Sequence, residues 1–140
     1  MKITIIGSSS FAKEMTEYQQ KLINLGHEVN LHEHYIELAQ GVRPDLTARI
    51  HKEHAKLKME NDYIRYHYHE IVSSDAVLVL NFDRKGIANY IGGNTLMELG
   101  FAHVHNKKIF LLNPIPEISY KDEIEAVAPV VINGDLSLIV

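Results

Sequence analysis

Two short runs, Ala76–Phe82 and Lys108–Leu112, constrain the fold more than any other feature, because their apolar residues follow one another almost without interruption. A strand with one face in water alternates apolar and polar side chains, whereas a strand covered on both faces is apolar nearly throughout. The two runs therefore predict central strands of a parallel sheet that has helices on both faces.

Weaker runs and helical patterns alternate with these two strands along the chain. The other candidate strands are Ile3–Ile6, Val29–Leu31 and Val130–Ile132. Apolar residues at three- and four-residue spacing predict helices over residues 11–25, 96–104 and 120–127. Alternation of strands and helices is typical of a doubly wound sheet with right-handed crossovers. We therefore predict a single domain, residues 1–140, with a flavodoxin-like three-layer α/β/α fold and about five parallel strands.

Residues 33–61 break this rhythm, because they are polar and rich in His, Lys and Glu. We interpret them as an insertion: a loop to about Pro44, then a long helix from Asp45 toward Ile71. The apolar stripe of that helix comprises Leu46, Ile50, Leu57, Ile64, Tyr68 and Ile71. The stripe exceeds what one small sheet face can cover, so we expect a homodimer or a higher even-numbered oligomer.

The composition of the chain excludes several classes of ligand and partner. The chain has no cysteine, which excludes disulfides and cysteine-bound zinc and is typical of a reducing cytoplasm. Its formal net charge of -4 provides no basic patch, so we do not expect a nucleic-acid polymer as partner. No apolar run approaches the roughly 20 residues that cross a membrane. The composition therefore favours a cytoplasmic protein with a small-molecule ligand and no membrane partner.

Two polar loops follow predicted strands, where ligands bind in open parallel sheets. The first, Gly7–Ser10, joins a strand to a helix, and backbone N–H groups in such a position favour an anion. The alternative is a turn with a serine N-cap, which needs only one of the serines. The loop is neither G-x-G-x-x-G nor a P-loop, so we predict no dinucleotide or other cofactor.

The second loop comprises Gly92, Gly93 and Asn94 and leads to Glu98. Two glycines allow a ligand to approach the backbone closely. The alternative is structural, since Thr95-x-x-Glu98 fits a capping box with Thr95 as N-cap. These residues alone leave both interpretations open.

The order of several segments resembles the nucleoside 2-deoxyribosyltransferase family and its relatives, the 2'-deoxynucleoside 5'-phosphate N-hydrolases. The segments that carry the resemblance are Ser74–Leu80, Met97–Ala102 and Lys107–Leu112. It implies that Glu98 is the catalytic nucleophile, that Asp75 lines the sugar site, and that Gly7, Ser8 and Ser9 hold a 5'-phosphate. It also implies that a second subunit completes each site, from a segment near residues 113–123.

Glycosidic chemistry suits a glutamate in this position. Cleavage of an N-glycosidic bond develops positive charge at C1' of the sugar, which a carboxylate can stabilise and then bind covalently. The chain has Phe11 and Gly92 where the family's transferases have a tyrosine and an acidic residue, so we favour a hydrolase over a base-exchanging transferase. A non-catalytic nucleotide sensor is the alternative from another class. The histidine pairs 32/34, 51/54 and 67/69 lack a zinc-binding pattern, so we predict no metal.

Overall fold

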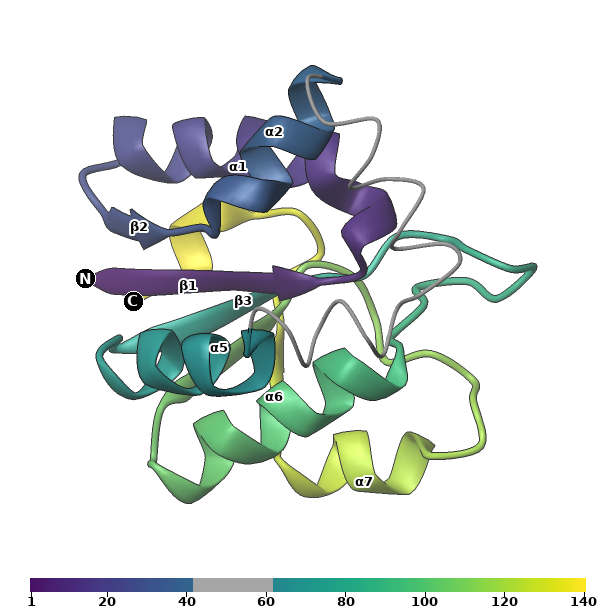
Figure 1. Ribbon diagram of the computed structural model, residues 1–140. Helices are drawn as coiled ribbons and strands as arrows, with labels where there is room; N and C mark the ends of the chain where they lie inside the picture. The colour runs from purple at the N-terminus through teal and green to yellow at the C-terminus, as the bar shows by residue number, and fades with distance from the viewer. Residues whose placement is uncertain (42–61) are drawn as a thin grey trace.

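The computed structural model describes residues 1–41 and 62–140 (Figure 1). Its sheet has five parallel strands in the order β2-β1-β3-β4-β5. The strands are β1 (Lys2–Gly7), β2 (Glu28–Asn30), β3 (Ala76–Leu80), β4 (Lys108–Leu111) and β5 (Val130–Val131). This order is that of flavodoxin-like folds, so the predicted fold class is confirmed.

Helices cover both faces of the sheet and make it the middle of three layers (Figure 1). On one side lie α1 (Ala12–Asn24), α2 (Glu33–Gln40) and the short 3-10 helix η2 (Leu136–Leu138). On the other lie α5 (Tyr63–Val72), α6 (Gly93–Val104) and α7 (Lys121–Ala126). No helix in the described ranges is long and apolar enough to cross a membrane.

Strand β3 explains the uninterrupted apolar run, because it supplies side chains to two separate cores. Leu78 and Leu80 pack with β1 and α1 residues such as Ile5 and Met15 on one face. Val77 and Val79 pack with α5 and α6 residues on the other face. All five β3 side chains are at most 1% exposed, which no alternating sequence could achieve without burying polar groups.

The insertion differs from its prediction at both described ends. The sequence predicts a loop after residue 33, but Glu33–Gln40 form α2, because His32 caps its first turn and Gly41, with φ of 69°, ends it. A continuous helix through Ile71 is wrong at Asp62, whose φ of 49° is left-handed, so α5 begins at Tyr63. The rest of the predicted helix, residues 45–61, lies outside the described residues.

Two asparagines join the carboxyl ends of β3 and β4. The buried Asn81 side chain donates to the carbonyls of Asn113 and Pro114 at 2.9 and 3.1 Å. Asn113 returns two hydrogen bonds, from its backbone N to Asn81 Oδ1 and from its side chain to the Asn81 carbonyl. Because buried polar groups left unpaired are costly, this exchange holds the two loops in a fixed relation.

At the end of β1, Gly7 requires a backbone that other residues avoid. Its φ is 154°, and a Cβ placed on it would lie 2.9 Å from the carbonyl oxygen of Leu80 in the neighbouring strand. Gly100 lies inside α6, and a Cβ placed on it would meet nothing within 4 Å. The two glycines therefore form a matched pair.

We predict that Gly7→Ala lowers the free energy of unfolding by roughly 1–3 kcal/mol through strain and collision with Leu80. Gly100→Ala should raise it by about 0.5–1 kcal/mol, because alanine restricts the unfolded chain and fits the helix. Urea unfolding of both variants beside the wild type checks the pair. Equal effects would contradict the close approach of β1 to β3.

Candidate functional site

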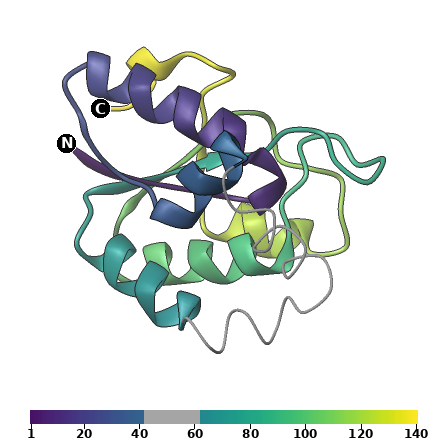
Figure 2. The ribbon, with the colours of Figure 1, turned by 45° about the horizontal axis from the view of Figure 1, so that its top comes forward.

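A cavity of about 1070 Å³ opens at the carboxyl ends of β1 and β3. The chain leaves β1 toward α1 on one face of the sheet and leaves β3 toward α6 on the other, which separates the two loops (Figure 2). This is the switch point at which open parallel sheets bind ligands. The predicted loops Gly7–Ser10 and Gly92–Asn94 both line it, so the structure brings these two parts of the predicted site together.

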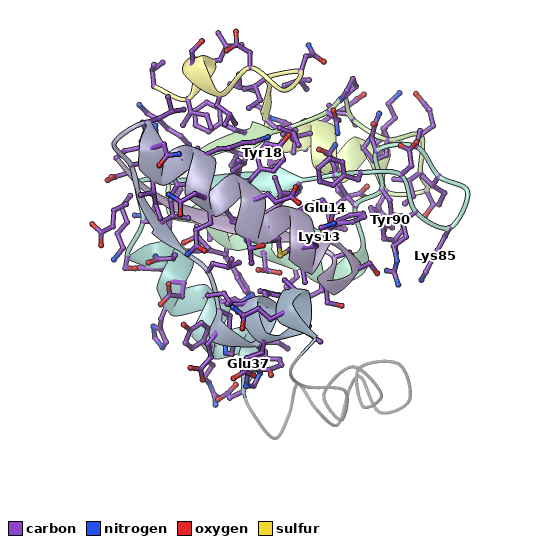
Figure 3. All side chains as sticks on the ribbon, turned by 90° about the horizontal axis from the view of Figure 1, so that it is seen from above. Lys13, Glu14, Tyr18, Glu37, Lys85 and Tyr90 are labelled. Carbon is purple, nitrogen blue, oxygen red and sulfur yellow. The ribbon has the colours of Figure 1, made fainter. Side chains whose placement is uncertain are left out.

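One end of the cavity is cationic. Arg84, on the loop that projects from β3, donates to Ser8 Oγ at 3.0 Å. Lys13 and Lys85 also line the cavity, and Figure 3 shows them at the same end of the molecule as Tyr90. Among the described lining residues three are cations and none is a carboxylate, although the chain as a whole is acidic. The field at this end therefore favours an anionic ligand.

The serine loop itself is a short 3-10 helix, η1 (Ser9–Phe11), with Ser8 as its N-cap. Ser8 Oγ accepts from Ser10 N at 3.2 Å as well as from Arg84. The predicted serine cap is therefore present, and it coexists with a cation that the sequence analysis did not identify. Nothing in the sequence near residue 8 indicated Arg84, because the residues are 76 positions apart.

On the α6 side of the cavity lies Glu98, which is only 2% exposed. Asn94 Nδ2 donates to its Oε1 at 2.7 Å, and His67 Nδ1 lies 2.9 Å from its Oε2. Asn94 and His67 line the cavity themselves, so Glu98 lies directly behind the wall. A carboxylate without these two donors would be buried and unpaired, which is strongly unfavourable.

The capping-box alternative for Glu98 is wrong. Helix α6 begins at Gly93 with Gly92 as N-cap, and no side chain caps it. Thr95 is therefore inside the helix and buried, and Glu98 falls in the second turn. The helix dipole acts mainly within the first turn. Glu98 is thus stabilised by side-chain donors rather than by the helix end.

A cluster of rings from α2 and α5 forms the wall beside His67; it comprises His32, His34, Tyr35, Tyr63 and Tyr66. Burial, together with the nearby charges of His34 and His67, lowers the pKa of His32 to about 4. His32 is therefore neutral at pH 7, as it must be for its Nδ1 to accept the α2 capping bond from His34 N at 2.9 Å. Burial and the charge of Glu98 raise the pKa of Tyr35.

Asp75 does not reach the cavity. It precedes β3, at the opposite edge of the sheet, and its Oδ2 accepts from Lys2 N at 2.7 Å. The five residues of β3, at about 3.3 Å each, separate it from the loops that bind ligands. The sequence order alone could have predicted this position of Asp75, because only residues that follow a parallel strand meet at the ligand-binding edge of the sheet.

The segments expected to contact a partner subunit have contacts within their own chain. Tyr68 packs on Phe101 and its hydroxyl lies 2.8 Å from His105 Nε2. Tyr120 donates to the carbonyl of Ile91. Ile50, Leu57 and the 51/54 histidine pair lie outside the described residues, and the oligomer stays a prediction. In the described ranges no group of three or more His, Asp or Glu side chains could hold a metal ion.

Comparisons of the chain with protein-family models, with curated proteins and with solved structures find no match.

We predict that His32 makes folding stability depend on pH between about 4 and 6.5, its lowered and its ordinary pKa. In that range the unfolded chain binds a proton that the folded chain excludes, so this contribution is complete above pH 6.5 and lost toward pH 4. His32→Asn keeps an N-cap acceptor but does not titrate. Denaturant unfolding across this range should therefore give a flatter pH dependence for the variant, and parallel curves would refute the assignment.

Proposed function

We propose that this chain is an N-glycosidase that cleaves a (deoxy)nucleoside 5'-monophosphate, with Glu98 as nucleophile. The observation that carries the proposal is one cavity that has a cationic serine loop on its α1 side and a buried, doubly hydrogen-bonded carboxylate behind its α6 side. A phosphate ester of a sugar matches the first side, and an electron-deficient sugar carbon matches the second. From the lack of cysteine we place this activity in the cytoplasm.

The phosphate would bind at Ser8, Ser9 and Arg84. The guanidinium of Arg84 already donates to the Ser8 hydroxyl, so a dianion placed there gains a charged donor and hydroxyl donors together. Lys13 and Lys85 add longer-range attraction at the same end. Phosphate held there directs the rest of the nucleotide along the cavity toward α6.

The chemical step is a double displacement. A Glu98 oxygen forms a bond to C1' while the bond from C1' to the base nitrogen breaks, and its electron pair leaves with the base, which takes a proton from solvent water. Water then replaces Glu98 at C1', which releases the sugar phosphate and restores the carboxylate. Asn94 is half-buried, lines the cavity and donates to Glu98 Oε1, so this oxygen is held next to the cavity.

The second candidate is a nucleotide-binding module without catalysis. The observation in its favour is the burial of Glu98, both of whose oxygens already accept hydrogen bonds. In that case the carboxylate only joins α5 to α6, and the nucleotide binds without change. The two candidates differ in whether free base appears.

We predict that Glu98→Gln abolishes base release, because the amide cannot form the glycosyl ester. The melting temperature should fall by only a few degrees, since the amide keeps the shape and an acceptor. Chromatography of free base from a panel of nucleosides and monophosphates measures the activity. Glu17→Gln, on the exposed face of α1, is the matched control and should keep full activity. A wild-type protein that releases no base from the panel supports the binding module instead.

We predict that Arg84→Ala raises KM for the monophosphate about 10- to 100-fold, the value of one or two charged hydrogen bonds. KM for the matching nucleoside should change little, because it has no phosphate. Ser8→Ala combined with Ser9→Ala should act in the same direction, since uniform binding is what is lost. Lys21→Ala, exposed near the end of α1 and not among the residues that line the cavity, is the control. Equal losses for nucleoside and monophosphate would contradict a phosphate site at this loop.

A further inference from the structure

His67 is the only histidine in the described residues whose ring nitrogen contacts Glu98. We propose that His67 is the positioning residue of the nucleophile: its Nδ1–H holds Glu98 Oε2 while Asn94 holds Oε1, so the carboxylate is fixed before substrate binds. The inference rests on the proposed glycosidase function and identifies the residue that orients its nucleophile.

The two donors differ in where they come from. Asn94 lies one turn before Glu98 on the same helix, so it restrains the carboxylate only relative to α6. His67 belongs to α5, and its bond at 2.9 Å ties the other oxygen to a separate element. With one donor on each oxygen, the carboxylate cannot rotate without breaking a hydrogen bond. Each oxygen still has a lone pair for the sugar carbon.

The His67 ring is itself fixed. It is buried, and rings of Tyr35, Tyr66 and His32 surround it with centroids 5.9, 5.8 and 6.1 Å away. These neighbours come from α2, its N-cap and α5, so the packing of two helices sets the direction of Nδ1. Because an ionised carboxylate only accepts hydrogen bonds, Nδ1 must carry the hydrogen in this pair. Which ring nitrogen of His67 carries the hydrogen can therefore be measured as a test of this hydrogen bond, without an activity assay.

If the role of His67 were merely structural, its hydrogen bond to Glu98 would only help to hold α5 against α6, as other contacts between these helices do. The chain offers a control for that role, because Tyr68, the next residue on α5, bonds His105 at the end of α6 at 2.8 Å. Tyr68→Phe removes an α5–α6 hydrogen bond without touching Glu98. His67→Asn places an amide N–H near the position of Nδ1, whereas His67→Leu removes the donor and keeps comparable bulk.

Steady-state kinetics on the monophosphate, with the melting temperature of each variant, tests the proposal. We expect His67→Leu to lower kcat about 100-fold with KM within about threefold, since misplacement of a reacting group acts on the chemical step. His67→Asn should recover most of that loss, and Tyr68→Phe should keep wild-type kcat even where its melting temperature falls. Wild-type kcat in folded His67→Leu, or equal kcat losses in His67→Leu and Tyr68→Phe, would overturn the proposal.

Nitrogen-15 NMR of the imidazoles separates this proposal from the proposed function. We expect the ring of His67, identified by its missing signal in His67→Asn, to carry a hydrogen on Nδ1. An Nε2–H tautomer would overturn the positioning role whatever the activity. A hydrogen on Nδ1 in a protein that releases no base would contradict the glycosidase and leave His67 as the residue that holds Glu98.

Discussion

The parallel pairing of β1 with β3 is the constraint on which the rest of the structure depends. Its register sets Gly7 opposite Leu80, and the close approach of the two backbones leaves no room for a side chain at residue 7. From that pair of strand ends the chain departs toward α1 on one face and α6 on the other. The cavity lies between the connections from β1 to α1 and from β3 to α6. The hydrogen bonds between Asn81 and Asn113 hold the loops that follow β3 and β4 in place.

The charge of the described cavity lining is opposite in sign to the net charge of the chain. The chain is acidic overall, yet the described residues that line the cavity include Lys13, Arg84 and Lys85 and no carboxylate. Glu98 lies behind the wall, where two donors compensate its burial. An anionic ligand in the cavity is therefore attracted by three cations, and the carboxylate of Glu98 lies behind its α6 side. For the function that we propose, this separation would let one part of the cavity hold the phosphate while the carboxylate acts on the sugar carbon.

Features encoded in local sequence were predictable, and features that depend on packing were not. The apolar run of β3 predicted a strand buried on both faces, and the loops Gly7–Ser10 and Gly92–Asn94 were predicted from their positions after strands. The role of Glu98 was predicted only from the family resemblance. Asp75 was wrongly assigned to the site because it precedes its strand. Thr95 was wrongly assigned as the N-cap because α6 starts three residues earlier than the capping pattern indicated. Arg84 and His67 contact residues 76 and 31 positions away, so no local pattern could assign them.

The central claim is that a covalent bond forms between Glu98 and C1' of the sugar. Its most direct test is to run the reaction on a deoxynucleoside monophosphate in buffer that contains methanol and to determine the anomeric configuration of the methyl glycoside by NMR. A double displacement through Glu98 predicts a product with the same configuration as the substrate. A product of inverted configuration would show that solvent attacks C1' directly, and it would contradict Glu98 as the nucleophile.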